Sequence, residues 1–294
     1  MSDDSKSVVH SVAKAFAVLR AFGPDLPELT VSEIGARTDL DRGTSFRLLN
    51  TLVSLGYVAP VPGSRRYRLA LKCLELGYTP LACDDLKRLS RPLLAELVAD
   101  VADAASLGML DGSDVVYVER VQGDVARSHL DRRVGSRTGI YAAALGQAIL
   151  AFEPPDVQRA VLESGERTKL SERTITDIDL LLVRLAETRK KGWAFSDGEN
   201  AYGLRTVAAP IFGRDGRVVA AVSATARVER CSLEAFVANG VPRVLAVTSE
   251  LSQAVRLSAG QRDPRLAVEK IRAVSTDPTP ARRNTTAPGQ RGEN

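Results

Sequence analysis

The chain has 294 residues, of which 44% are hydrophobic and 26% are charged, and its formal net charge is +4. This length predicts two domains, and the charge permits nucleic-acid binding without requiring it. The polar start MSDDSKSVVH is unlike a signal peptide, and no apolar run approaches the roughly 20 residues of a membrane span, so we expect a cytoplasmic protein with no membrane partner.

Residues 11–22 are predicted to form a first helix that ends at Gly23-Pro24. The segment 31–69 then reads as two short helices, a tight turn and a basic hairpin. Thr30 is expected to cap the first of these helices, with Glu33 three residues further on as in a capping box. The apolar faces are predicted to comprise Val12, Phe16, Val18 and Leu19 in the first helix and Leu29, Val31 and Ile34 in the second.

The next helix is expected to begin after Asp41 and to end at Gly56. Its buried stripe is predicted to contain Phe46, Leu48, Leu49, Leu52, Val53 and Leu55. The outward residues suit base reading, since Arg can pair with guanine, Asn with adenine, and hydroxyls with bases or phosphates. They are Arg42, Thr44, Ser45, Arg47 and Asn50.

Two strands are predicted at 57–59 and 67–69, joined around Pro62-Gly63-Ser64. Residues 37–72 hold seven Lys or Arg against two Asp, which makes the segment about +5. An ordinary solvated helical hairpin is the alternative, but the order of elements favours a winged helix-turn-helix that places one helix in the major groove. The arginines at the tip and flank of the wing, expected to meet phosphates or a minor groove, are Arg65, Arg66 and Arg68.

The rest of the chain is predicted to form an α+β sensor domain. Residues 259–294 are rich in Pro, Thr, Arg and Gly and are expected to be a disordered tail of about +3. The expected elements are a linker helix after 71, a long amphipathic helix from near 84, a hairpin at 106–110 and 115–121, helices at 140–152, 156–163 and 177–191, a second hairpin at 206–212 and 217–225, and a last helix at 241–257.

From about residue 10 to 257 the chain resembles the IclR family of bacterial transcriptional regulators. The motifs are SVAKAFAVLRAF at 11–22, TVSEIGARTDL, GTSFRLLNTLVSLGY, DGSDVVYVERV at 111–121, VGSRTGIYAAALGQAILA at 134–151, GENAYGLRTVAAPIF at 198–212 and GRVVAAVSATAR at 216–227. This chain departs from the family pattern at Gly43 and Ser45. The family usually has a hydroxyl residue at 43, Thr at 44 and an apolar residue at 45, so the base preference of this chain is open. The expected division is a disordered 1–9, a winged helix-turn-helix at 10–70, a linker helix at 71–88, a GAF-like effector-binding domain at 89–258, and the tail.

The resemblance also implies a pocket for a small organic acid. A helix starting near Tyr141 with Ala142-Ala143-Ala144 would offer backbone N–H groups to an anion, although helix–sheet packing explains these small residues equally well. VGSR-x-x-x-Y with GLRTVAAPI is similar to members that sense protocatechuate and 4-hydroxybenzoate. This implies that Arg137 or Arg205 pairs with the carboxylate and that Tyr141 contacts the ring, with structural roles for the two arginines as the alternative. Matching the family's pocket implies backbone donors at Ala144 and Leu145 and lining residues at Ser196, Leu204, Thr206, Ser223 and Thr225. Ser196 and Thr206 replace the acid and the cysteine of the glyoxylate-responsive pattern.

The predicted function is a DNA-binding transcriptional regulator, a homodimer or tetramer whose partners are a double-stranded operator and a small organic acid. The alternative is a ligand-sensing adaptor that contacts proteins instead of DNA. With two histidines and no nucleophile elbow, phosphate loop or dinucleotide fingerprint, no enzyme and no cofactor are expected. Cys73, Cys83 and Cys231 lack metal-ligand spacing, so we expect inert thiols, with redox sensing as the less favoured reading.

Overall fold

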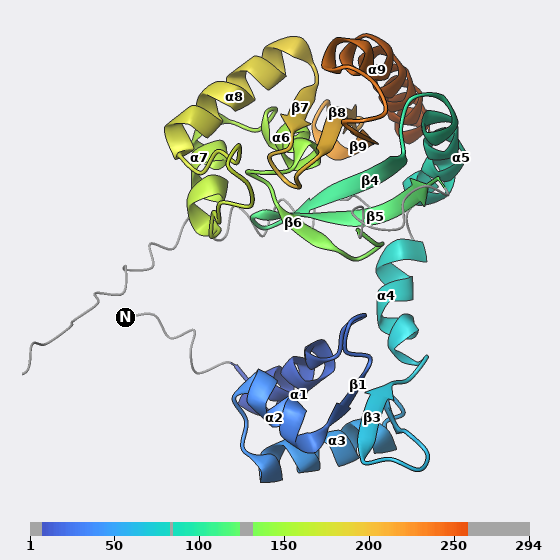
Figure 1. The fold of residues 1–294 in the computed structure, drawn as a ribbon, viewed down its shortest axis with the longest axis vertical. Coiled ribbons are helices and arrows are strands. Elements are labelled where there is room, and N and C mark those ends of the chain that lie inside the picture. Colours follow the sequence, from blue (N-terminus) through green and yellow to red (C-terminus); the bar gives the residue numbers. More distant parts are fainter. Residues whose placement is uncertain (1–7, 83–84, 124–131, 258–294) are drawn as a thin grey trace, which may run out of the picture. The chain divides into compact units, whose positions relative to one another are not determined.

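The structure is a computed structural model that describes residues 8–82, 85–123 and 132–257 (Figure 1). The chain divides into two compact units, Met1–Cys83 and Asp84–Asn294. The terminal segments that were predicted to be disordered lie outside the described residues, apart from Val8 and Val9. Cys83 also lies outside them.

The first unit packs three helices against a small antiparallel sheet with the strand order β1-β3-β2. Its core contains Val18, Leu29, Ile34, Leu49 and Leu52, all buried. The hairpin of β2 and β3 was predicted, whereas β1 was not. The elements are α1 (His10–Ala21), β1 (Glu28–Thr30), α2 (Val31–Thr38), α3 (Arg42–Ser54), β2 (Val58–Pro60), β3 (Arg66–Leu69) and α4 (Cys73–Ala82).

The predicted helix caps are confirmed. The Thr30 hydroxyl accepts a hydrogen bond from the Glu33 amide, and the Glu33 carboxylate accepts one from the Thr30 amide at 2.7 Å, which completes a capping box. Asp41 accepts from the Thr44 amide at 2.8 Å and begins α3. Between the two helices, Asp39 has the left-handed conformation (φ 54°), which Asp tolerates and which lets the chain reverse within a few residues.

Several predicted core residues of this unit are wrong. Val12 and Phe16 of α1, Phe46 of α3 and Leu55, the C-cap residue after α3, are exposed by about half. Leu29 lies in β1 rather than in a helix. The reason is that each helix buries a narrow face, Val18 with Ala21 in α1 and the line through Leu49 and Leu52 in α3. Apolar residues beside these lines remain on the surface.

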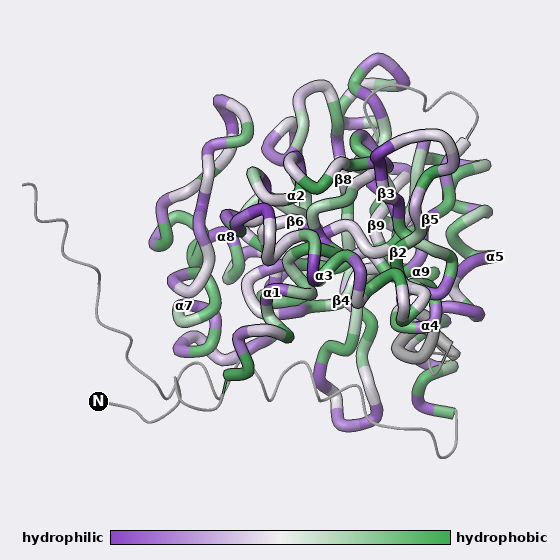
Figure 2. The backbone as a smooth tube through the Cα atoms, turned by 90° about the horizontal axis from the view of Figure 1, so that it is seen from below, coloured by the Kyte–Doolittle hydropathy of each residue, from purple (hydrophilic) through white to green (hydrophobic). Residues whose placement is uncertain are grey.

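Two helices were expected here, and two are present. The linker helix expected after residue 71 is α4 (Cys73–Ala82), and the long amphipathic helix expected from near residue 84 is α5 (Asp85–Asp100), so the range 71–88 given to the linker also includes the start of α5. The buried Leu86, Leu94 and Leu97 show that α5 already belongs to the second unit. Along α5 hydrophilic and hydrophobic stretches alternate, as expected of an amphipathic helix (Figure 2).

The second unit is an α+β domain around a six-stranded antiparallel sheet with the order β6-β5-β4-β9-β8-β7. Both predicted hairpins are confirmed, while β6 and β7 were not predicted and the last helix begins eight residues earlier than expected. The elements are β4 (Ala104–Asp111), β5 (Asp114–Gln122), β6 (Arg137–Gly139), α6 (Ala144–Leu150), α7 (Pro155–Ser164), α8 (Ile178–Lys191), β7 (Ala194–Asp197), β8 (Leu204–Phe212), β9 (Val218–Arg227) and α9 (Leu233–Leu257).

Helices cover both faces of this sheet. On one face α9 lies against β8, where Gly240 meets Val207, and α5 packs beside it (Figure 1). The next residue, Ala208, points to the opposite face and joins the core around α6, with α8 and α7 outside it. Among the described residues no helix combines the length and apolar character needed to cross a bilayer.

Candidate functional site

The outward face of α3 carries most, but not all, of the residues predicted to read DNA. Arg42, Arg47 and Asn50 are exposed. Thr44 is half-buried, and its hydroxyl donates to the Asp41 carboxylate at 2.7 Å as part of the cap. Ser45, predicted to face outward, is 0% exposed because it stands four residues before Leu49 on the buried line of the helix. The family's usual apolar residue at this position agrees with that burial.

The three wing arginines differ in their surroundings. Arg65 and Arg68 are exposed, whereas the Arg66 guanidinium donates to the Glu28 carbonyl at 2.9 Å and forms an ion pair with Glu33 at 3.2 Å. The hydrogen bond from the Thr30 amide and, to a smaller extent, the positive charge of Arg66 lower the pKa of Glu33 below its usual value. Arg66 therefore fastens the wing to α2 within the first unit, and its contact with phosphate stays a prediction.

A cavity of about 190 Å³ lies in the second unit on the α6 face of the sheet. Strand register brings its hydroxyl groups together, because Ser196 pairs with Thr206 and Thr206 pairs with Thr225 across β7, β8 and β9. The Thr206 and Thr225 hydroxyls are 3.0 Å apart and share a hydrogen bond. Seven of the nine predicted effector residues line the cavity, namely Ala144, Leu145, Ser196, Leu204, Thr206, Ser223 and Thr225.

Two arginines that sequence reasoning missed also line the cavity. Arg120 lies next to Ser106, to whose hydroxyl its guanidinium donates at 2.7 Å, and burial lowers the pKa of this guanidinium. Arg132 donates to the Asn200 side-chain oxygen at 3.2 Å. Arg120 belongs to the motif DGSDVVYVERV, but strict strand alternation would place it on the face opposite Tyr117. A register shift between β4 and β5 at Leu107 and Gly108 brings both side chains to the cavity, and the sequence pattern gives no signal of this shift. The remaining lining residues that were missed are Tyr117, Ala143, Asn200 and Ala201.

Arg137 and Tyr141 were predicted to hold the effector, but they do not line the cavity. Arg137 on β6 pairs with Asp111 at 2.7 Å and Asp114 at 3.0 Å, so it fastens the turn between β4 and β5. The Tyr141 hydroxyl donates to the Thr168 carbonyl and its ring is part of the hydrophobic core. Both residues have structural partners that satisfy their polar groups.

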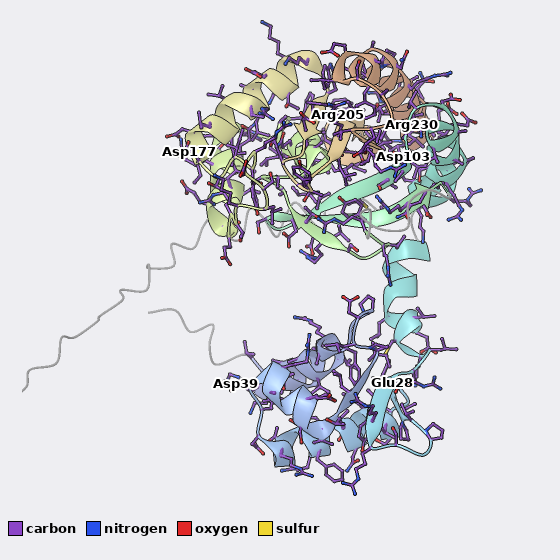
Figure 3. All side chains as sticks on the ribbon, in the orientation of Figure 1. Glu28, Asp39, Asp103, Asp177, Arg205 and Arg230 are labelled. Carbon is purple, nitrogen blue, oxygen red and sulfur yellow. The ribbon has the colours of Figure 1, made fainter. Side chains whose placement is uncertain are left out.

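Arg205, the other candidate for the effector carboxylate, serves structure as well (Figure 3). It precedes Thr206 on β8 and therefore points to the opposite face of the strand. Its guanidinium pairs with Asp197 at 3.1 Å and donates to the Cys231 carbonyl at 3.0 Å.

Behind the cavity, the loop that carries Asn200 is held by a buried carboxylate. Glu199 is 6% exposed and pairs with Arg184 of α8 at 3.0 Å, and its backbone carbonyl accepts a hydrogen bond from the Thr174 hydroxyl at 2.6 Å. Burial raises the pKa of Glu199, and the positive charge of Arg184 only partly offsets this. The position of the loop that carries Asn200 thus depends on the buried Glu199 carboxylate.

The described cysteines show no arrangement for redox or metal chemistry. Cys73 donates to the Tyr57 carbonyl at 3.2 Å, and burial raises the pKa of its thiol, which disfavours the reactive thiolate. Cys73 and Cys231 are both free. Within the described part of the chain no three His, Cys, Asp or Glu side chains gather as metal ligands would.

Comparison with known protein families decides what this pair of units is. Residues 11–62 match the IclR helix-turn-helix domain, and residues 80–253 match the family described as bacterial transcriptional regulator IclR C-terminal. The chain belongs to the IclR family. It is a DNA-binding transcriptional regulator, and the proteins of this family that it matches are regulators rather than enzymes.

The sequences of curated relatives align with most of this chain. It is 32% identical over 232 residues to the HTH-type transcriptional regulator XynR of Escherichia coli, which is 78% of this chain and 92% of that protein. It is 30% identical to the Pca regulon regulatory protein of Pseudomonas putida, over 82% of each chain. The Glycerol operon regulatory protein of Streptomyces griseus is 32% identical over 76% of this chain and 86% of that protein.

Solved structures confirm the fold. A transcriptional regulator from Rhodococcus sp. RHA1 superposes with a TM-score of 0.73 at 35% identity, covering 84% of this chain and 98% of that chain. An IclR homologue from Microbacterium hydrocarbonoxydans, crystallised with 4-hydroxybenzoate, has a TM-score of 0.73 at 25% identity, over 84% of this chain and 100% of that chain.

Proposed function

We propose that this IclR-family regulator reads its operator with the exposed face of α3 and holds the phosphates with the wing. The residues assigned to base edges are Arg42, Arg47 and Asn50, and those assigned to the backbone are Arg65 and Arg68. Exposure of these five side chains, and the use of Thr44, Ser45 and Arg66 within the unit, support this division. It follows the general rule that phosphate contacts position a protein while base contacts specify the site.

The effector is a small organic acid in the cavity of the second unit. The observation that carries this proposal is the lining itself, which combines the Arg120 and Arg132 guanidiniums with the Ser196, Thr206 and Thr225 hydroxyls. Guanidinium groups bind carboxylates through charge-assisted hydrogen bonds, and hydroxyls can orient the remaining polar atoms. At about 190 Å³ the cavity is smaller than the roughly 300–1,000 Å³ of drug-sized sites, which favours a compact molecule.

Within this class we favour an aromatic acid such as 4-hydroxybenzoate or protocatechuate. The supports are the motif resemblance, the relative named for the Pca regulon, and the homologue crystallised with 4-hydroxybenzoate. Tyr117 and Leu145 would contact the ring in place of Tyr141. Another relative is named for the glycerol operon, so a non-aromatic ligand is the second candidate.

We also propose a homodimer, or a tetramer of two dimers, that reads a pseudo-palindromic site. One recognition helix contacts only a few base pairs, and two copies a helical turn apart multiply the contacts. Occupation of the cavity would change the relative pose of the two helix-turn-helix units, a coupling on the order of 1–3 kcal/mol.

The test is fluorescence-anisotropy binding of the full chain to DNA upstream of its own coding region, at two salt concentrations and against scrambled competitor. We expect tight binding that survives competitor at about 150 mM salt, where non-specific affinity is only on the order of 10⁻⁴–10⁻⁶ M. The same complex is then titrated with 4-hydroxybenzoate, protocatechuate and glycerol. Equal binding to both DNAs contradicts this operator, and flat titrations with both acids contradict the aromatic effector.

A further inference from the structure

One large apolar side chain stands on the exposed face of α3. Phe46 is 48% exposed and is absent from the set of residues that pack into the core of the first unit, although it lies in the middle of a well-formed helix. Arg42 and Asn50 are four residues before and after it, so the three side chains occupy one face. Gly43, three residues before Phe46, has no side chain to cover the ring.

The charges around Phe46 select its partner. Arg42 and Arg47 flank the ring, Asn50 offers an amide, and Arg42–Ser54 contains no acidic residue. If this face of α3 packed against the same face of a second chain, the arginines of the two copies would meet, because a two-fold interface uses the same surface patch on both subunits. A polyanion with a small apolar spot fits better. In the major groove that spot is the thymine C5-methyl, the group that apolar side chains, Phe included, contact when they read bases.

We propose that Phe46 reads thymine, by burying its ring against a C5-methyl group next to the bases contacted by Arg42 or Asn50. This inference rests on the DNA binding proposed above and adds a specificity residue that the buried-stripe pattern had assigned to the core. A methyl group transferred from water to an apolar contact is stabilised enough to change affinity about fourfold. Each half-site should therefore hold a thymine whose methyl is required.

The experiment first selects binding sites from a random DNA library with the full wild-type chain. Each thymine of the selected site is then replaced singly by deoxyuridine, which removes the methyl and leaves every hydrogen-bonding group in place. We expect one or two positions per half-site at which this change weakens wild-type binding about fourfold. The Phe46→Ala variant should bind the thymine DNA and the deoxyuridine DNA equally. The Phe46→Leu variant should retain part of the preference for thymine.

The matched control is Phe16→Ala, which removes an equally exposed phenylalanine (46%) from α1 of the same unit. It should leave the methyl discrimination intact. A wild-type chain that is indifferent to every deoxyuridine, or a Phe46→Ala variant that still discriminates, overturns the assignment while leaving DNA binding in place. A Phe46→Ala variant that instead loses self-association would assign the ring to a contact between copies. A chain that enriches no site overturns this inference together with the proposed DNA reading.

Discussion

Arg66 on β3 and Glu33 in the first turn of α2 form an ion pair of 3.2 Å between residues 33 positions apart in the sequence. The same Glu33 carboxylate completes the capping box of α2, and the same Arg66 guanidinium binds the Glu28 carbonyl of β1. One acidic and one basic side chain thus connect the wing, the edge strand and the start of the helix-turn-helix. Arg66 holds the wing in place, and the neighbouring Arg65 and Arg68 are exposed.

This pair predicts an acid-sensitive first unit. Because the folded state lowers the pKa of Glu33 below 4.5, its contribution is fully present above that value and is lost as the pH falls through the lowered pKa. Glu33→Gln keeps a capping-box side chain but removes the charge. We expect its melting temperature to be below that of wild type at about pH 7, with a difference that shrinks as the pH falls through the lowered pKa, measured by circular dichroism. A difference that stays constant as the pH falls would show that the charge is irrelevant.

A second prediction separates base reading from phosphate binding. Arg47→Ala should cost about 1–3 kcal/mol on the selected site and relax preference at one base pair. Arg65→Ala should weaken binding on all sequences and reduce the salt slope by about one. Both are measured by anisotropy between about 50 and 200 mM salt. The reverse pattern, with Arg65 changing base preference, would exchange the two roles.

Local chemistry explains why the helix boundaries of the first unit could be predicted. A cap depends on residues three apart, as Thr30 with Glu33 and Asp41 with Thr44 show. The orientation of Ser45 and Phe46 could not be obtained in the same way, since an apolar periodicity fits the helix almost as well when rotated by one residue. Which of the two is buried depends on packing against α1 and α2, which is a tertiary property.

The cavity shows the same limit. Thr206 and Thr225 were assigned to the pocket by resemblance, and strand register places the two residues opposite each other on β8 and β9. Arg137 was predicted to bind the effector because it stands in a motif with Tyr141, whereas Arg120 was not considered. The sequence did not reveal strand β6, whose pairing with β5 places Arg137 beside Asp114. Where an unpredicted strand pairs, the side chains on it cannot be assigned to a face.

The buried Ser45 gives a third prediction. Its hydroxyl is 0% exposed and has no hydrogen-bond partner among the described residues, and such an unsatisfied group costs about 1–3 kcal/mol. Ser45→Ala should therefore leave the melting temperature unchanged or raise it, with operator affinity unaffected. A tenfold loss of operator affinity in a stable Ser45→Ala variant would instead restore the base-reading role suggested by the sequence.

A fourth prediction tests whether the effector binds in the cavity beside Thr206 or at Arg137 outside it. Thr206→Val removes one hydroxyl of the 3.0 Å pair with little change of volume. A hydrogen bond worth about 1 kcal/mol corresponds to about a fivefold loss of affinity for 4-hydroxybenzoate by calorimetry. Arg137→Ala is the matched control, because its partners Asp111 and Asp114 lie outside the cavity, and it should bind as wild type. A variant series in which only Arg137→Ala loses binding would contradict the cavity assignment.

The last prediction concerns Glu199, whose folded-state pKa is raised by burial. A raised carboxyl pKa means that the folded state binds more protons than the unfolded state, so stability declines as the pH rises from 4.5 through the raised value and stays lower above it. Glu199→Gln mimics the protonated acid and should melt at a higher temperature than wild type at about pH 8, with the gain vanishing below about pH 4. Glu187→Gln is the control, since the exposed Glu187 is 3.8 Å from Lys191 in an i,i+4 pair worth only about 0.5 kcal/mol. A gain that persists in acid, or that appears equally in Glu187→Gln, would show that burial of the Glu199 charge is not its cause.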